Sequence, residues 1–599
     1  MENWALALQK GMDAFTATLA SVPQLGMWYS FLVRLALPVL ALVIVIRAIR
    51  SLFKVPCLPE VWAYLMLPNG GKEVLTHWEN IMGRSEKADV ILNYPTISRQ
   101  HAALIRAEDD TWTIYDLDSK GGITVNGKPT GEKAAVKYGD VIALGGVETV
   151  LLPVSSEEKE KYRRRRKAYR PIPWQLEAVL LTLFQALAMF QLILSEGEGA
   201  SIAIPLVFAG LIAVMWCYFL VLRRLRQVGF EMEVMAFFLS TLSLCITCSS
   251  NTPALPKQFC AMVLGVLVFL ILGSFMRDLE RVKRIRWLMS AAAIGLVSLT
   301  LVLGVPTQFG AANWIHLGGL SLQPSELAKA CYVFAGAATL DRLFRKRNLG
   351  LFMLLTFICL GSLALMSDFG TAAIFFVTFL VIAFLRSGDW GTLTLICGGA
   401  VFAILVVLAV KPYILNRFAT WGHAWQNASA GSGYQQTRAM SAAASGGLIG
   451  VGAGNGWLHR VAAADTDLVF GMVCEEWGLI IALLTVVVIV ALAVFAVRSS
   501  QTGRSSFYVI AACGASSMMV FQTCLNVLGA VDLLPLTGVT FPFVSNGGTA
   551  MVASWGLLAF LKASDTRQNA SFAIRLPSLH QERSHDRLAP GKQTGGGRR

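Results

Sequence analysis

The sequence predicts a polytopic α-helical membrane protein of about thirteen spans that also carries a soluble all-β sandwich. Hydrophobic residues make up 55% of the 599 residues and charged residues only 15%, whereas soluble domains contain about 25% charged residues. The mean hydropathy is +0.58, and apolar runs long enough to cross a bilayer recur along the chain. One stretch near the N-terminus instead alternates short apolar runs with Gly and Asn. This composition excludes a soluble multidomain enzyme, a disordered chain and a secreted disulfide scaffold.

Thirteen apolar runs are expected to cross the membrane. They are 28–46, 174–194, 200–222, 232–249, 259–276, 287–305, 327–340, 350–366, 370–386, 391–410, 468–497, 507–530 and 545–561. Arg47, Arg50 and Lys54 follow the first run, which predicts an external N-terminus and a cytoplasmic continuation. The basic loops and the basic C-terminal tail then all fall on the cytoplasmic side. We therefore attribute the net charge of +14 to membrane topology and expect no nucleic-acid partner.

Composition divides the chain into five parts. They are an external tail and first anchor (1–54), a soluble cytoplasmic domain (55–155), a basic linker with two helices (156–228), a ten-helix membrane body (229–563) and a basic cytoplasmic tail (564–599). In the second part, short β-rich runs separated by Gly and Asn-Gly turns are typical of a β-sandwich. The body contains one long external loop, 411–466, and loops of this length often carry function.

Three short motifs lie within the soluble part. They are Gly83-Arg84, Ser98-Arg99-Gln100-His101 and Asn126-Gly127. Their order and spacing resemble a forkhead-associated (FHA) domain, a β-sandwich that binds phosphothreonine through loops at one end. The resemblance implies phosphopeptide contacts by Arg84, Ser98, Arg99 and Asn126, because guanidinium, hydroxyl and amide donors hold a phosphate well. His101 is expected to support the loop, and ordinary loop structure is the alternative for Arg84 and Ser98.

One position departs from the FHA pattern. The Asn that normally helps to grip the phosphothreonine peptide is Gly121 here. The fold is unaffected, but one donor is missing. We expect phosphopeptide binding to be retained and weak, with a phosphothreonine protein of a Ser/Thr kinase pathway as the partner.

Five motifs of the membrane body resemble a second family. They are "GAANWIHLGGLSLQPSELAK" (310–329), "SDFGTA" (367–372), "SGGLIGVGAGNG" (445–456), "DTDLVFGMVCEEWGL" (465–479) and "LLPLTGVTFPFVSNGGT" (533–549). Together they are similar to the SEDS family, the RodA, FtsW and SpoVE proteins. The resemblance implies a ten-helix peptidoglycan glycosyltransferase of the bacterial cytoplasmic membrane that polymerises lipid II, an undecaprenyl-pyrophosphate-linked substrate, in elongation, division or sporulation. It also implies a class B penicillin-binding protein transpeptidase as partner.

Asp467 is the candidate catalytic residue. It lies where the long external loop enters a span, and a carboxylate at the membrane edge is a functional candidate by default. Glycan polymerisation needs a base that takes a proton from an acceptor hydroxyl, and it needs charge relief for the departing pyrophosphate. The resemblance aligns Asp467 with the catalytic Asp of the family. The alternative is an Asp that only complements a helix dipole.

Other residues of these motifs are candidates for substrate binding. They are Trp314, Gln323, Ser325, Glu326, Lys329, Asp368, Arg438 and Ser545. Glu326 and Lys329 are three residues apart, so a structural ion pair is the strong alternative to pyrophosphate binding. Glu475 and Glu476 are expected to brace the cavity. A divalent cation such as Mg²⁺ or Mn²⁺ would suit a pyrophosphate leaving group, although the sequence offers no metal-ligand cluster and no metal site is predicted.

Three departures distinguish the chain from the family pattern. The family's Arg before Trp is Asn313, the Lys of its G-K-G turn is Val451, and its Pro-Glu is Ala462-Ala463. Two cationic positions near a pyrophosphate are thus lost. Arg438, His459 or Arg460 in the external loop could compensate for them.

Two alternatives to a polymerase remain open on the sequence. A flippase for lipid-linked precursors would use intramembrane charges such as Glu326, Lys329 and Asp368 as its pathway. A catalytically idle scaffold of the divisome or elongasome would dock other proteins through the FHA-like domain. The motif losses favour the scaffold, whereas a carboxylate beside a large external loop favours the enzyme.

Overall fold

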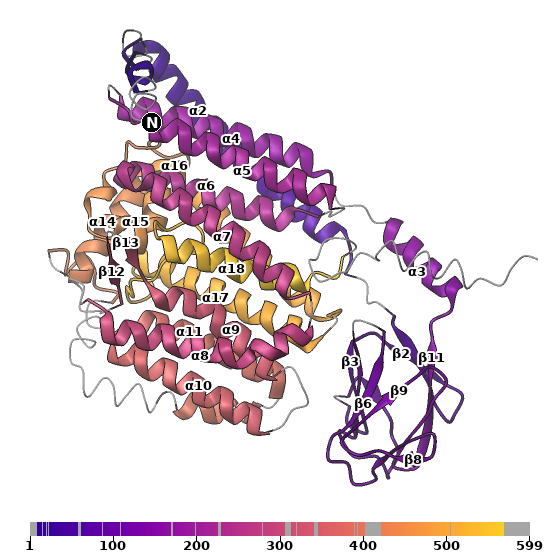
Figure 1. Cartoon of the computed structure of the whole chain (residues 1–599). Helices are drawn as coiled ribbons and strands as arrows, with labels where there is room; N and C mark the ends of the chain where they lie inside the picture. Colours follow the sequence, from indigo (N-terminus) through magenta and orange to yellow (C-terminus); the bar gives the residue numbers. More distant parts are fainter. Residues whose placement is uncertain are drawn as a thin grey trace, which may run out of the picture.

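The computed structural model describes most of residues 9–567. It leaves out positions 15, 22, 87, 198, 278, 319, 392, 400, 430 and 504 and the stretches 19–20, 58–60, 108–109, 169–171, 226–228, 306–312, 341–345, 388–389 and 402–420. The chain folds into a bundle of long helices and a β-sandwich beside one end of that bundle (Figure 1).

Twelve long helices of the described residues correspond to twelve of the thirteen expected spans. They are α2 (Pro23–Lys54), α4 (Trp174–Glu196), α5 (Ala203–Arg224), α6 (Glu231–Asn251), α7 (Leu255–Phe275), α8 (Leu279–Leu303), α9 (Pro324–Leu340), α10 (Lys346–Leu365), α11 (Phe369–Ser387), α16 (Val469–Ser500), α17 (Ser506–Ala530) and α18 (Gly548–Ser564). The remaining expected span, 391–410, lies largely outside the described residues. By length and hydropathy, the described residues contain nine candidate membrane spans, one of which joins α6 and α7.

The centre of the bundle is formed by mainly apolar helices that are buried around their whole circumference. Every residue of α18 from Thr549 to Ser564 is buried, and so is every residue of α6 from Glu231 to Cys248. A helix that is hydrophobic on all sides belongs in a core. By contrast, α8 and α10 keep large exposed apolar side chains such as Val302 and Phe357, as expected where a helix faces lipid.

The β-sandwich follows α2 and has eleven short strands. They are β1 (Ala63–Met66), β2 (Lys72–Leu75), β3 (Glu79–Gly83), β4 (Val90–Ile91), β5 (Ala102–Arg106), β6 (Trp112–Asp116), β7 (Ile123–Val125), β8 (Lys128–Pro129), β9 (Lys133–Val136), β10 (Val141–Leu144) and β11 (Val147–Pro153). One sheet has the order β2-β1-β11-β10-β7-β8 and the other β4-β3-β5-β6-β9. Their inward side chains form a hydrophobic core of their own that includes Met82, Leu104, Trp112 and Ile142. The expected all-β sandwich is confirmed.

The turn before β3 fixes the sandwich to the membrane body. Trp78 is 6% exposed, and its ring lies edge-on to Tyr508 of α17 with 6.1 Å between centroids. The His77 ring bonds to the carbonyl of Gly503 through Nδ1 at 2.6 Å. Gly503 lies between α16 and α17, so the sandwich contacts the connection between these two helices.

The opposite end of the bundle carries the other non-spanning elements. These are β12 (Ile315–Leu317), β13 (Leu320–Leu322), α14 (Gly431–Gly446), the 3-10 turn η2 (Leu458–Arg460) and α15 (Ala464–Asp467). In Figure 1 they lie at the ends of the long helices away from the sandwich. The expected long loop at 411–466 is therefore partly helical: it contains α14, which packs against α16. A further helix, α3 (Ser156–Ala168), forms the basic linker.

Candidate active site

Asp467 is the last residue of the short helix α15 and is half-buried. Ala463, which precedes α15, has φ +58, and its carbonyl accepts a hydrogen bond from the Asp467 amide at 2.8 Å. The Asn526 side chain of α17 donates to the main-chain carbonyl of Asp467 at 3.0 Å and to that of Val539 at 2.8 Å. The backbone at Asp467 is therefore held between the long helix α17 and the segment that contains Val539.

Gly538 lets this segment approach the Asp467 carboxylate. Its φ is +69, and a Cβ atom added there would lie 3.0 Å from Asp467 Oδ2. A left-handed backbone favours glycine, and glycine also permits close approach. A side chain at this position would meet the candidate base directly.

Asp465 and Ser545 anchor the same region from two further directions. Asp465 Oδ2 accepts hydrogen bonds from Ser250 at 3.1 Å and from Asn546 at 2.7 Å. The Ser545 hydroxyl donates to the carbonyl of Thr466 at 2.7 Å and accepts from the Phe541 amide. Ser545 is buried, and its hydroxyl holds the loop before Asp467.

Asp368 lies on the other side of the Gly538 segment. It accepts from the Thr371 amide at the start of α11 and from the Asn313 side chain, both at 3.1 Å. A Cβ atom at Gly370 would lie 3.0 Å from that of Thr537. Asn313, which stands where the family has Arg, thus donates an amide hydrogen to a buried carboxylate and supplies no charge.

Lys329 and Glu326 form the buried ion pair that the sequence left as an alternative. Lys329 Nζ lies 2.7 Å from Glu326 Oε1 and 2.9 Å from Gln522 Oε1. Lys329 is 1% exposed and Glu326 3%. Lys329 also joins α9 to α17 through its bond to Gln522. This burial and pairing support a structural role for Lys329.

Glu475 and Glu476 hold the glycine-rich turn between α14 and η2. Glu475 accepts from the Trp457 amide at 2.9 Å and from the Leu458 amide at 3.0 Å. Glu476 accepts from the Gly454 amide at 3.0 Å and from the Ser249 hydroxyl at 2.7 Å. Both carboxylates are buried, and their contacts agree with the expectation that they brace the site.

The cations of this region lie on the protein surface. Arg438 of α14 is exposed, and its guanidinium lies 5.1 Å from the centre of the Tyr434 ring. Arg460 is also exposed, at the end of η2. His459 is half-buried, and its Nδ1 has no hydrogen-bond partner among the described residues. The two arginines are accessible to a negatively charged ligand, whereas His459 Nδ1 is buried.

The other predicted substrate contacts lie around the start of α9. Trp314 is half-buried and its backbone pairs with that of Val305. The Gln323 amide donates to the Thr549 hydroxyl at 3.4 Å. Ser325 is fully buried, and its hydroxyl lacks a hydrogen-bond partner in the described part of the chain. Of these three residues, only Trp314 keeps appreciable exposure.

The sequence analysis did not predict two positioning residues, Gln522 and Asn526. They are four residues apart on α17 and share one helix face. Polar residues inside an apolar span are costly and therefore informative, so this spacing could have indicated them. Among the described residues no three His, Cys, Asp or Glu side chains are close enough to hold a metal ion.

The loops at one end of the sandwich have the geometry expected for the FHA motifs. His101 is fully buried. It accepts from the Ser98 amide through Nδ1, and its Nε2 contacts the carbonyl of Gly122. The Ser98 hydroxyl accepts from the Lys120 amide at 3.1 Å, whereas Arg84 and Arg99 are exposed. His101 thus supports the loop, and the two guanidinium groups are accessible.

Gly121 and Asn126 make contacts within the sandwich that the FHA motifs alone do not indicate. A Cβ atom at Gly121 would lie 2.7 Å from the Cα atom of Gly145, so this backbone leaves no room for the Asn of the family pattern. Asn126 bonds to Asp140 and to the Val141 amide, each at 2.9 Å. Its hydrogen bond holds the pKa of Asp140 below the ordinary value. Asn126 therefore stabilises the turn between β7 and β8.

The sequence of the membrane body matches a known family. Residues 215–569 match the FtsW/RodA/SpoVE family, described as cell cycle proteins, and this range is more than half of the chain. The chain belongs to the FtsW/RodA/SpoVE family. Residues 80–145 match the FHA domain. This family member therefore carries an FHA domain ahead of its membrane body.

Curated relatives of this FtsW/RodA/SpoVE protein carry enzyme names. It is 30% identical over 336 residues to peptidoglycan glycosyltransferase RodA of Mycobacterium tuberculosis (strain ATCC 25618 / H37Rv), covering 52% of this chain and 70% of the relative. It is 31% identical over 319 residues to the probable peptidoglycan glycosyltransferase FtsW of Pseudomonas fluorescens (strain SBW25), covering 50% and 78%. The solved rod shape determining protein RodA of Thermus thermophilus has a TM-score of 0.41 at 23% identity, covering 55% of this chain and 94% of that one.

Proposed function

We propose that this chain, a peptidoglycan glycosyltransferase by its family, polymerises lipid II at the outer face of the bacterial cytoplasmic membrane with Asp467 as general base. The observation that carries the proposal is the position of Asp467. It is a half-buried carboxylate at the end of the bundle that lies away from the FHA domain. Its backbone is fixed by Asn526, and its carboxylate is approached by Gly538.

The chemistry requires one proton to move as a glycosidic bond replaces the bond between the donor sugar and pyrophosphate. The acceptor hydroxyl attacks the anomeric carbon of the donor sugar, its proton passes to Asp467, and the bond from that carbon to the pyrophosphate oxygen breaks. Attack from the face opposite the leaving group inverts the anomeric configuration. The exposed Arg438 and Arg460 are suited to relieve the charge of the departing pyrophosphate.

The arrangement of intramembrane charges favours this reaction over precursor flipping. A flippase pathway needs charges that face a polar route across the bilayer. Glu326 and Lys329 instead pair with each other in the interior, where Lys329 also donates to Gln522. Asp368 likewise accepts hydrogen bonds from Asn313 and Thr371.

The FHA domain supports a regulatory role on the cytoplasmic side. We propose that Arg84, Ser98 and Arg99 bind a phosphothreonine protein and thereby connect a Ser/Thr kinase pathway to the synthase. The family resemblance also suggests a class B penicillin-binding protein as the transpeptidase partner. We propose that the cytoplasmic FHA domain spans residues 55–155 and that the membrane body spans residues 229–563.

The decisive experiment compares glycan polymerisation by the purified full-length protein and by Asp467→Asn on fluorescent lipid II. Asn keeps the shape of the side chain but does not accept the proton, so polymer should disappear in this variant. Asp465→Asn is the matched control, because an amide oxygen can still accept the hydrogen bonds of Ser250 and Asn546. An undiminished polymer yield from Asp467→Asn would exclude Asp467 as the base.

A further inference from the structure

The glycine-rich turn of the candidate active site is packed between α16 and two helices that precede the family-matched region. On one side, the Val451 amide donates to the Glu475 carbonyl at 2.8 Å and the Gly452 amide to the Glu476 carbonyl at 3.1 Å. On the other side lie α2 and α4. A Cβ atom at Gly452 would lie 3.4 Å from Gln191 Nε2 of α4 and 3.6 Å from Arg34 Cδ of α2.

The contact with α4 continues one turn further along that helix. Gly454 has φ +73, and a Cβ atom there would collide with the Ser195 hydroxyl. Any residue other than glycine would push the turn away from α4. The same Gly454 donates its amide to the Glu476 carboxylate, so α4 and α16 grip the turn from opposite sides.

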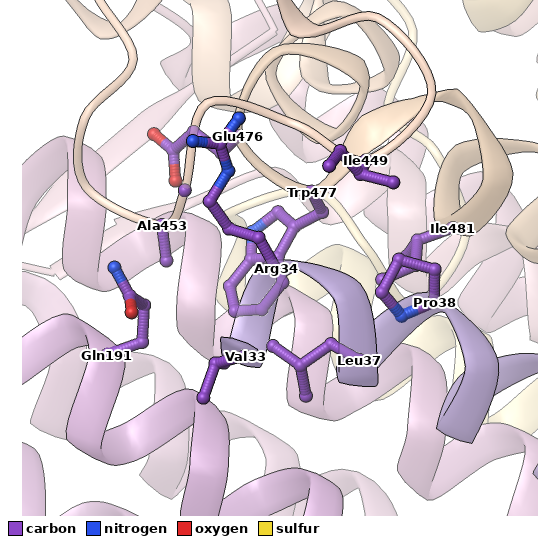
Figure 2. A pocket seen from close by; sticks show the side chains of 11 residues that line it. Val33, Arg34, Leu37, Pro38, Gln191, Ile449, Ala453, Glu476, Trp477 and Ile481 are labelled. Atoms are coloured by element: carbon purple, nitrogen blue, oxygen red, sulfur yellow. The ribbon is translucent and has the colours of Figure 1, made fainter. Parts of the chain in front are cut away.

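A small cavity lies where these elements meet. Its volume is about 10 Å³, roughly the room that one water molecule needs. Figure 2 shows Arg34, Gln191 and Glu476 around it, with the Arg34 side chain extending from α2 toward Glu476. Arg34 Nε, Gln191 Oε1 and Glu476 Oε1 are buried and have no hydrogen-bond partner within the described residues. Three polar groups therefore face one shared space.

Charge explains why an arginine is useful at this position. Glu476 is 1% exposed, and a buried carboxylate without an opposite charge is strongly destabilising. A membrane anchor gains nothing from an arginine within its apolar run, because that charge is costly in lipid. Arg34 lies eleven residues inside α2 and is only half-exposed. Its guanidinium faces the cavity that Glu476 lines and can offset the charge of this carboxylate.

We propose that Arg34 and Gln191 are positioning residues for the glycine-rich turn of residues 447–458, acting through Glu476. On this view, α2 and α4, which precede and follow the FHA domain along the chain, also form part of the active-site wall. Arg34 stabilises the Glu476 carboxylate, Glu476 holds the Gly454 amide, and the neighbouring Glu475 holds Trp457 and Leu458 before the chain enters α15. The expected kinetic effects rest on the proposed polymerase function, whereas the packing of the turn is independent of that function.

The test combines lipid II polymerisation with hydrogen exchange of residues 447–458 in the full-length protein. Arg34→Met keeps the aliphatic stem and removes the charge. We expect kcat to fall about tenfold with little change in KM, because small displacements of a catalytic group carry rate penalties of this order or larger. Exchange in the turn should become faster. Arg34→Lys should restore most of the rate, and Leu35→Ala, on an exposed position of the same helix, should match the wild type.

A double-variant cycle shows whether Arg34 acts through Glu476. Residues that act through one contact are not additive, so Arg34→Met combined with Glu476→Gln should be no slower than the slower single variant. Gln191→Leu should also accelerate exchange in the turn, and it serves as the second test if Arg34→Met does not fold. Wild-type rates and exchange in Arg34→Met and Gln191→Leu, or multiplicative effects in the double variant, would overturn the inference. Absence of polymer from the wild type would instead overturn the proposed function, while the exchange result would still decide the packing.

Discussion

The side-chain amide of Asn526 donates one hydrogen bond to the carbonyl of Asp467 and a second to the carbonyl of Val539. These two bonds connect the candidate base, the long helix α17 and the segment that carries Gly538. The same helix begins beside the FHA domain, where Trp78 packs against Tyr508 of α17. One helix therefore contacts both ends of the proposed regulatory and catalytic system.

Asn526→Ala should slow polymerisation strongly without preventing folding. The change removes both hydrogen bonds, and a displacement of about 1 Å at a catalytic group can lower the rate by about 10²-fold. Steady-state kinetics on lipid II should show a loss in kcat larger than any change in KM. Cys524→Ala, a half-buried position on the same helix, is the control. Equal rates for the two variants would remove Asn526 from the positioning of Asp467.

Lys329→Met should destabilise the membrane body. It leaves the Glu326 carboxylate buried without its cation, and breaking a buried pair in this way costs about 3–5 kcal/mol. Thermal or denaturant unfolding in detergent would measure the loss. The double change of Glu326 and Lys329 to Met should be less destabilising than Lys329→Met alone. If the double variant is the less stable of the two, the ion pair is not the source of the effect.

Residues 55–155 and 411–466 should lie on opposite sides of the membrane, with 411–466 outside. Both test positions are exposed: Lys128 on β8 and Ala462 between η2 and α15. In intact cells, a membrane-impermeant thiol reagent should label Ala462→Cys and leave Lys128→Cys unlabelled until the cells are opened. The parent protein corrects for labelling of the native cysteines. The reverse pattern would place Asp467 on the wrong side for an external polymerase.

Trp78→Ala should release the FHA domain from the membrane body. Trp78 is the buried side chain of this contact and packs on Tyr508, and truncating a buried aromatic residue typically costs about 3–5 kcal/mol. Hydrogen exchange at residues 501–508 should become faster, while exchange within the sandwich core stays slow. Lys128→Ala, at the exposed β8 edge, should change neither. Unchanged exchange at 501–508 would show that Trp78 does not secure the domain.

The isolated segment 55–155 should bind phosphothreonine peptides weakly. Gly121 supplies no side-chain donor, and losing a hydrogen bond to a charged group costs about 1.5–3 kcal/mol. We expect a Kd of roughly tens of micromolar, about −6 kcal/mol. Calorimetry should detect binding of the phosphorylated peptide, no binding of the unphosphorylated peptide, and loss of binding in Arg84→Ala. Equal affinity for both peptides, or none for any peptide of a library, would make this sandwich a docking module that does not read phosphate.

The sequence alone determined the class of the protein and the order of its parts. Long apolar runs predict spans because the bilayer demands about 20 apolar residues for each helix. Because of this local requirement, twelve of the expected spans overlap helices of the structure. The alternating runs of 55–155 predicted a sandwich for a similar reason, since side chains of a strand alternate between its two faces. Asp467 was proposed because a carboxylate at the membrane edge is a functional candidate and because the resemblance aligns it with the catalytic Asp of the family.

Only the tertiary structure decided which polar groups meet. Nothing local in the sequence places Arg34 and Glu476 at one cavity, or joins Asn313 to Asp368 and Asn526 to Asp467. Helix packing brings these distant residues together. The same packing buries Lys329 beside Glu326 and Gln522, which supports the structural alternative for this pair. A distant contact also decides the residue at position 121. Gly145, from another connection between strands, approaches so closely that it excludes a side chain at Gly121. Contacts between distant segments depend on how whole helices and sheets pack, and this packing is the information that motifs and periodicity do not carry.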